Sequence, residues 1–268
     1  DDINPYNARR LSLISELRKA IETDQLAIYL QPQLDTHNMS IVSAEALIRW
    51  NHPKLGFIPP DEFIGLAENS GVIKPLTRWV ITNAIKTIAF IHRRGHKIGL
   101  SINISPKNIE EVDLTQHLVQ ELKRFNVAPQ FVTLEITETA MLNNPALATQ
   151  VLNQWNQIGL STSIDDFGTG YSSLSHLKKL PMSELKIDRS FIMDMNKNDD
   201  DMMIVRSTLD ISHNMRMRVV AEGVEDENML HVLKKMGCDV IQGYMLSKPL
   251  APEKFLDWLN QTNYQVGF

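Results

Sequence analysis

Residues 26–49, LAIYLQPQLDTHNMSIVSAEALIR, contain two strand-like runs, 26–34 and 40–49, separated by only five residues. A parallel crossover needs about a dozen residues or more, so these two runs are expected to form an antiparallel hairpin. A helix-like segment precedes the hairpin at 9–23, with Leu11, Ile14, Leu17 and Ile21 on one face. The hairpin therefore introduces one antiparallel strand close to the N-terminus.

Downstream of Trp50, strand-like and helix-like segments alternate. We expect strands at 98–104, 131–137, 161–165, 185–188, 218–221 and 239–242, and helices at 61–69, 74–93, 108–124, 146–158, from Ser172, 200–214, 227–236 and 252–259. Repeated β-α units over roughly 250 residues are typical of an α/β fold with a closed barrel. The prediction is a TIM-like (β/α)8 barrel with one antiparallel strand; a doubly wound open sheet is the main alternative.

The amino-acid composition limits the classes of protein to which this chain can belong. The chain has 268 residues, 43% of them hydrophobic, and shows no linker or composition shift, so residues 1–268 are expected to form one domain, with residues 1–10 as a linker remnant from upstream domains. No apolar run approaches the length of a membrane span. The single cysteine, Cys238, excludes a disulfide scaffold and a cysteine-based zinc site. A net charge of −5 argues against binding to a DNA or RNA polymer, and an anionic ligand would need bound cations.

Polar residues recur within the apolar strands, at or near their C-terminal ends. They are Glu45, Asn103, Glu135, Asp165, Asp166, Lys186, Glu222 and Gln242. From Glu45 to Gln242 the mean spacing is about 33 residues, close to the ~30 residues of one β-α-β unit. Such a spacing would bring the side chains together on one rim of a barrel, where these folds carry their chemistry.

Five carboxylates on one rim would repel each other unless cations bind there. Oxygen ligands without histidine or cysteine favour Mg²⁺ or Mn²⁺, and the adjacent pair Asp165 and Asp166 suits two ions that promote in-line attack on a phosphodiester. Any one of these residues alone would more often be a surface or structurally paired residue. The glycine-containing stretch 166–173, DFGTGYSS, is compatible with a phosphate-binding loop or with a mobile loop that caps a helix.

Seven motifs together resemble those of the EAL-domain family, bacterial phosphodiesterases specific for cyclic di-GMP. They are EALIRW from Glu45, SINIS from Ser101, LEITET from Leu134, DDFGTGYSSL from Asp165, LKIDRSF from Leu185, AEGVE from Ala221 and QGY from Gln242. They occur in the family's order and spacing, and the resemblance extends from about Leu11 to Leu259.

The resemblance implies a role for each matching residue. Glu45, Asn103, Glu135 and Asp165 would bind one metal ion, and Asp166 and Glu222 would serve the second ion and its waters. Lys186 would hold and help activate the attacking water, with Gln242 nearby, so the implied catalytic residues are Glu45, Lys186, Glu222 and Gln242. Gln31, Leu47, Arg49 and Asp166 would contact the substrate, and Glu138 would anchor the loop 166–173.

The implied activity is metal-dependent hydrolysis of cyclic di-GMP to linear pGpG, with two Mg²⁺ or Mn²⁺ ions as cofactors. A receptor that binds cyclic di-GMP without cleaving it, and acts through protein partners, is the first rival. An unrelated metal-dependent barrel enzyme, such as a lyase acting on an enolate, is the second. We further expect a homodimer, a cytoplasmic domain without membrane contact, and upstream sensor or cyclase-like domains in the full-length protein.

Overall fold

The structure is a computed structural model that describes residues 5–23, 25–111, 113–138, 144–168 and 180–267. Its elements in chain order are α1 (Pro5–Ile21), β1 (Leu26–Asp35), β2 (Ser40–His52), β3 (Gly56–Ile58), α2 (Pro60–Ser70), α3 (Ile73–Arg93), β4 (Gly99–Asn103), the 3₁₀ helix η1 (Pro106–Asn108), α4 (Leu114–Phe125), η2 (Pro129–Phe131), β5 (Val132–Thr137), α6 (Pro145–Ile158), β6 (Ser161–Phe167), β7 (Glu184–Ile187), α8 (Arg189–Asp194), α9 (Asp199–Asn214), β8 (Arg218–Ala221), α10 (Glu227–Lys235), β9 (Val240–Gln242), α11 (Pro252–Gln261) and β10 (Gln265–Val266).

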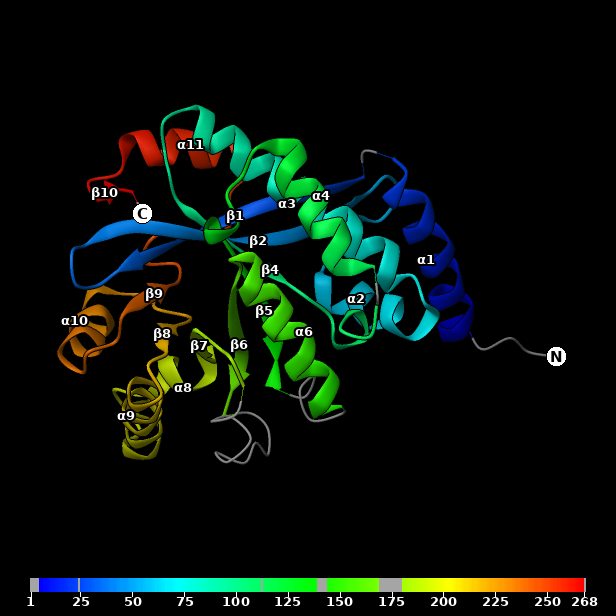
Figure 1. Ribbon diagram of the computed structural model, residues 1–268. Coiled ribbons are helices and arrows are strands. Elements are labelled where there is room, and N and C mark those ends of the chain that lie inside the picture. Colours follow the sequence, from blue (N-terminus) through cyan, green and yellow to red (C-terminus); the bar gives the residue numbers. More distant parts are fainter. Residues whose placement is uncertain (1–4, 24, 112, 139–143, 169–179, 268) are drawn as a thin grey trace.

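Eight strands close into a barrel in the order β1-β9-β8-β7-β6-β5-β4-β2, and β2 pairs again with β1. β1 runs antiparallel to both of its neighbours, β2 and β9, whereas the other neighbours in the barrel are parallel. Figure 1 shows helices arranged around the outside of these strands. The predicted barrel with one antiparallel strand is confirmed, and closure excludes the open sheet.

Strand β7 carries apolar residues on its outward face and polar residues on its inward face. In β7, Leu185 and Ile187 are fully buried in the hydrophobic core, while Lys186 between them points to the opposite face and is also buried. The outward residues pack against the apolar faces of the surrounding helices, such as the buried stripe of α3 that includes Ile81, Ile85 and Ile88. Both faces of β7 are therefore buried, and its polar face lies toward the barrel interior.

The structure differs from the prediction at several boundaries. The first helix begins at Pro5 rather than Arg9, so residues 5–10 of the expected linker are helical. β2 extends to His52, which places Glu45 in the middle of its strand and not near its C-terminal end. The extension pairs with β3, an element that was not predicted because it is only three residues long. The helix expected from Ser172 and residues 169–173 of the glycine-containing loop lie outside the described residues.

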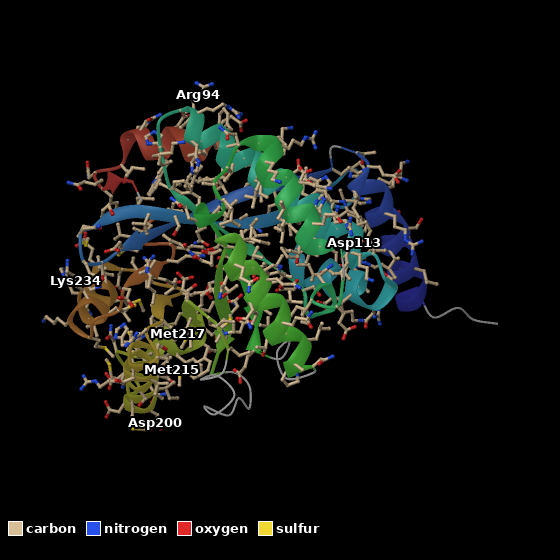
Figure 2. The ribbon with its side chains drawn as sticks, in the orientation of Figure 1. Arg94, Asp113, Asp200, Met215, Met217 and Lys234 are labelled. Atoms are coloured by element: carbon tan, nitrogen blue, oxygen red, sulfur yellow. The ribbon has the colours of Figure 1, made fainter. Side chains whose placement is uncertain are left out.

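Charged side chains cover the outside of the molecule. In Figure 2 the labelled residues Arg94, Asp200 and Lys234 lie at the periphery of the ribbon, and all three are exposed. Within the described part of the chain, no helix combines the length and the apolar character needed to cross a membrane.

Candidate active site

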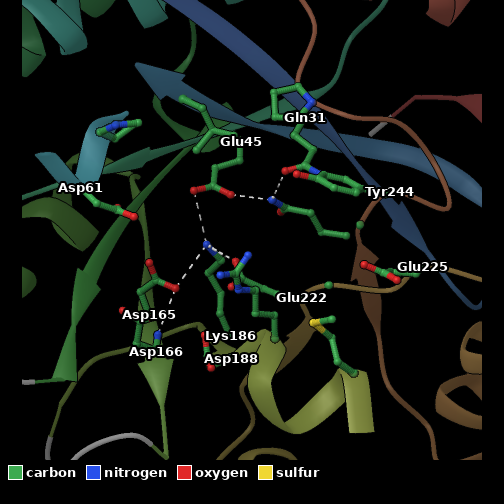
Figure 3. A pocket seen from close by; sticks show the side chains of 18 of the residues that line it. Gln31, Glu45, Asp61, Asp165, Asp166, Lys186, Asp188, Glu222, Glu225 and Tyr244 are labelled. Atoms are coloured by element: carbon green, nitrogen blue, oxygen red, sulfur yellow. Dashed lines mark hydrogen bonds and ion pairs between the residues drawn. The ribbon is translucent and has the colours of Figure 1, made fainter. Parts of the chain in front are cut away.

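A cavity of about 540 Å³ opens at the end of the barrel where the parallel strands finish (Figure 3). Nine residues singled out from the sequence line this cavity: Gln31, Glu45, Leu47, Arg49, Asp165, Asp166, Lys186, Glu222 and Gln242. They come from β1, β2, β6, β7 and β9 and from the segment just after β8. The predicted convergence on one rim is thus present in the structure.

Lys186 lies at the centre of the cluster with a side chain that is only 1% exposed. Its Nζ lies 2.7 Å from Glu222 Oε1 and 2.8 Å from Glu135 Oε2. Asp165 Oδ1 follows at 3.3 Å and Glu45 Oε1 at 3.6 Å. One buried ammonium therefore pairs with four carboxylates that arrive from four different strands or strand ends.

One glutamine and one asparagine donate hydrogen bonds to Glu45. Gln242 Nε2 donates to Glu45 Oε2 at 2.6 Å and to Gln31 Oε1 at 3.1 Å, and Asn103 Nδ2 donates to Glu45 Oε1 at 2.7 Å. Gln33 Nε2 donates to Gln242 Oε1 at 2.8 Å, which fixes the orientation of that amide. Both oxygens of Glu45 are therefore oriented by amide donors as well as by Lys186.

Asp165 and Asp166 reach the same site although they are adjacent in a strand. Alternation would normally direct them to opposite faces. The pairing of β6 with β7 shifts between Ile164 and Phe167, so β6 contains one extra residue there, and Asp166 adopts a left-handed backbone with φ of 54°. This β-bulge turns the second aspartate toward the cavity. One carboxylate oxygen from each of Asp165, Asp166 and Glu222 lies within 4.8 Å of the others.

Burial and crowding shift the pKa values of the cluster. Burial raises the pKa of Glu135 well above its usual range, despite Lys186, and raises the pKa of Glu222 to about 7. For Glu45, burial is outweighed by Lys186 and by the hydrogen bonds from Gln242 and Asn103, so its pKa is lowered. Burial opposes the charge on Lys186, but the four surrounding carboxylates raise its pKa well above normal. Lys186 is therefore protonated at neutral pH.

The donor set of this site fits hard divalent cations. The carboxylates and the side-chain amides of Asn103 and Gln242 offer oxygen ligands, the type that Mg²⁺ and Mn²⁺ prefer. Asp165, Asp166 and Glu222 together are close enough for one ion to bridge them. Glu45 and Glu135 pair with Lys186, which also contacts Asp165 and Glu222. The acidic cluster can therefore bind a metal.

Three predicted residues do not line the cavity. Asn103 is largely exposed and donates a hydrogen bond to Glu45, and Glu135 is buried and in contact with Lys186. Glu138 is 4% exposed, and neither of its carboxylate oxygens has a hydrogen-bond partner among the described residues. Because most of the loop that it was predicted to anchor lies outside those residues, the anchoring role stays a prediction.

Sequence reasoning missed other residues of the site. Gln33 lies in the same QPQ run as Gln31. Because side chains two apart in a strand share a face, Gln33 could have been predicted to lie at the site together with Gln31. The motifs also contained lining residues to which no role was given, namely Asp188, Arg189, Glu225 and Tyr244. Asp61, in the first turn of α2, lies outside every motif, and nothing in the spacing pointed to it.

A family model described as the EAL domain matches residues 14–249. Cyclic di-GMP phosphodiesterase NbdA of Pseudomonas aeruginosa is 39% identical over 252 residues, covering 92% of this chain and 32% of the relative. Cyclic di-GMP phosphodiesterase PdeR of Escherichia coli strain K12 is 37% identical over 248 residues, covering 92% and 37%. The chain thus spans about a third of the length of these curated relatives.

A solved structure of PaMucR phosphodiesterase in complex with c-di-GMP is similar to this chain throughout. Its TM-score is 0.87 at 36% sequence identity, and the match covers 91% of this chain and 99% of that chain. The agreement over almost the whole of both chains confirms the barrel architecture.

Proposed function

The chain belongs to the EAL domain family, and on that premise we propose that it hydrolyses cyclic di-GMP to the linear dinucleotide pGpG. The observation that carries the proposal is the set of four carboxylates around buried Lys186, next to the cluster of Asp165, Asp166 and Glu222. The relatives NbdA and PdeR, which share more than a third of their aligned residues with this chain, are named for this activity.

The cavity offers contacts suited to a guanine dinucleotide. Arg49 faces the cavity from β2, with its guanidinium 5.7 Å above the ring of Tyr29 and its Nη1 bonded to the Ile48 carbonyl at 2.9 Å. A guanidinium held in one orientation is well suited to bind a phosphate. Gln31 presents an amide and Leu47 an apolar surface on the same side of the cavity. We assign these three residues to substrate binding.

Two Mg²⁺ or Mn²⁺ ions, held by Glu45, Asn103, Glu135, Asp165, Asp166 and Glu222, would polarise the phosphodiester and lower the pKa of the attacking water. Lys186 cannot accept a proton, because its raised pKa keeps it charged. Its role in the proposal is to donate hydrogen bonds and so to orient the lone pair of the attacking water. Glu222 lies 2.7 Å from Lys186 and close to Asp165 and Asp166, so in the proposal it serves the second ion and its waters.

Other parts of the prediction extend beyond this domain. A homodimer, a cytoplasmic location and upstream sensor or cyclase-like domains are included in the proposal as expectations from the family resemblance.

Gln242 is assigned to hold Glu45 and to lie beside the attacking water, which its hydrogen bond to Glu45 supports.

The test is to incubate the chain with cyclic di-GMP and Mg²⁺ and to separate the products by chromatography. Linear pGpG should accumulate with the unmodified chain. It should not accumulate with Glu45→Gln, which keeps the side-chain volume but removes a charge next to Lys186. Binding of cyclic di-GMP without product in either chain would instead identify the receptor, and absence of both binding and product would refute the substrate assignment.

A further inference from the structure

An exposed phenylalanine forms part of the wall of the catalytic cavity. Phe57 is the central residue of β3, and it lines the cavity although 56% of it is exposed. Pro60 and Asp61, which follow in the chain, line the cavity too. Figure 3 shows Asp61 at the edge of the site. The segment from β3 to the first turn of α2 is therefore a wall of the cavity that carries an aromatic ring.

The pairing of β3 with β2 fixes the direction of the Phe57 side chain. Phe57 is the direct partner of Asn51, and Ile58 is the partner of Trp50. Trp50 and Ile58 are buried in the core, so Asn51 and Phe57 project from the opposite face. Arg49 precedes Asn51 by two residues and shares this face, which is the face toward the cavity. Phe57 is thus a diagonal neighbour of Arg49, with Cα atoms about 7–8 Å apart.

The turn before Phe57 is held in one conformation by a buried histidine. His52 Nδ1 accepts hydrogen bonds from the backbone N–H of Lys54 at 3.2 Å and of Leu55 at 3.0 Å. A ring nitrogen that accepts carries no proton, so the other nitrogen, Nε2, donates to Glu16 Oε2 on α1 at 2.9 Å. The hairpin therefore presents Phe57 on a fixed support, and little ordering is needed when a ligand packs against its ring.

Leu55, in the same turn, shows what distinguishes Phe57 from an ordinary exposed apolar residue. Leu55 is 54% exposed, but it is not among the described residues that line the cavity. Single exposed apolar residues of this kind are common on protein surfaces. Phe57 is equally exposed, yet it faces the cavity beside the arginine that is assigned to a phosphate. A flat apolar ring next to a phosphate site suits a nucleobase, because every base has a face that stacks on an aromatic ring.

We propose that Phe57 is a substrate-binding residue on which one base of the cyclic dinucleotide stacks, while Arg49 binds the adjacent phosphate. This assignment deepens the proposed function and rests on it. Stacking tolerates any base, so Phe57 contributes affinity and does not select guanine. Because the base is not a reacting group, the stack is present in the bound substrate and in the transition state alike. Phe57 therefore lowers KM without raising kcat.

Variants of Phe57 separate stacking from general apolar contact. Phe57→Ala removes the ring, Phe57→Leu keeps an apolar side chain without a flat face, and Phe57→Tyr keeps the flat face. Leu55→Ala is the matched control, because it truncates an equally exposed apolar side chain in the same turn.

Steady-state kinetics with cyclic di-GMP and Mg²⁺ compare these variants. Loss of the aromatic partner of one base typically weakens affinity by about 5- to 150-fold. We expect KM to rise about tenfold in Phe57→Ala and Phe57→Leu, with kcat close to that of the parent. KM should stay close to the parent's value in Phe57→Tyr and in Leu55→Ala.

Two measurements without turnover report on the contact itself. Titration calorimetry with cyclic di-GMP in Ca²⁺ gives the dissociation constant, which should change in the same order as KM. Phe57→Trp and Leu55→Trp each add one fluorescent ring to the four native tryptophans. A stacked base should quench the added emission in Phe57→Trp and leave that of Leu55→Trp unchanged.

The outcomes separate this proposal from the proposed function. Unchanged KM and dissociation constant in Phe57→Ala or in Phe57→Leu would overturn the stacking role, and so would an equal loss in Leu55→Ala or a lower kcat at unchanged KM. In each of these cases the parent still produces pGpG, and the proposed function stands. Weaker binding by Phe57→Ala together with no hydrolysis by the parent would support the stack and refute only the hydrolysis. A parent that binds no cyclic di-GMP would refute both.

Discussion

Replacement of Lys186 by methionine tests the central feature of the site. The substitution keeps a long unbranched side chain but removes the cation that four carboxylates share within 3.6 Å. Removing one partner of a buried ion pair costs about 3–5 kcal/mol, because the remaining charge is left buried and uncompensated. At about 2–4 °C per kcal/mol for a chain of this size class, the melting temperature in a chelator should fall by about 6–20 °C.

The loss of folding stability in Lys186→Met should depend on pH. Burial already raises the pKa of Glu135 above its unfolded value, and the loss of Lys186 raises it further. A carboxyl with a raised folded-state pKa is favourable to folding at low pH, and this stability is lost as the pH rises through the folded-state pKa. The deficit of Lys186→Met should therefore be largest at pH 8 and should shrink toward pH 5. Added Mg²⁺ should also narrow it, by replacing the lost positive charge.

Calorimetry at both pH values, with chelator and with Mg²⁺, measures these differences directly. Lys235→Met is the control, because Lys235 is exposed at the end of α10. Turnover of Lys186→Met should fall by roughly 10²-fold, because about 1 Å of misplacement of the attacking water can cost that much in rate. A melting temperature equal to that of the parent in chelator at pH 8 would refute the view that Lys186 neutralises the cluster.

Three further predictions concern metal, loop and charge. Chelation should abolish hydrolysis and Mg²⁺ or Mn²⁺ should restore it, whereas Ca²⁺ should restore little because of its longer, looser coordination; activity in excess chelator would contradict this. Glu138→Ala should melt within a few degrees of the parent yet lose most activity, with a smaller loss at high Mg²⁺; a slightly less stable but active variant would instead identify a helix cap. In chelator, folding stability should decline as pH rises from about 4.5 through 7, because burial raises the pKa of Glu222 to about 7. Glu222→Gln should flatten that decline, and calorimetry of both chains from pH 4 to 9 checks it.

The periodic part of the site could be predicted from the sequence because the fold itself is periodic. Each β-α unit delivers one inward polar residue, so the spacing from Glu45 to Gln242 was sufficient to bring strands β2 to β9 to one rim. The hairpin could also be predicted from the sequence, because five residues are too few for a parallel crossover. Residues outside this period could not be predicted from the sequence. Asp61 enters the cavity from the first turn of α2, where nothing local distinguishes it from an ordinary acidic residue at a helix N-terminus.

The interior of the barrel shows a second limit of pattern reading. Serine and threonine in a strand, such as Ser163 or Thr133, are compatible with either a buried or a solvated face, so their common direction is visible only once the register of each pair is known. The role of Gln33 was equally hidden in the sequence. Its side chain donates a hydrogen bond to Gln242, which lies 209 residues away. Such partners depend on barrel closure, which brings β1 beside β9.

The aspartate pair shows why chemistry and backbone have to be considered together. The sequence analysis placed Asp165 and Asp166 at one site that holds two ions, yet regular strand alternation would direct them to opposite faces. The structure resolves the conflict with a β-bulge and a left-handed Asp166, a conformation in which Asp and Asn are several-fold enriched among non-glycine residues. Aspartate thus suits position 166 for two reasons: it supplies a carboxylate, and it accepts a positive φ. Alanine at this position would remove the charge and strain the turn at once, so only asparagine, which tolerates the same backbone, isolates the contribution of the charge.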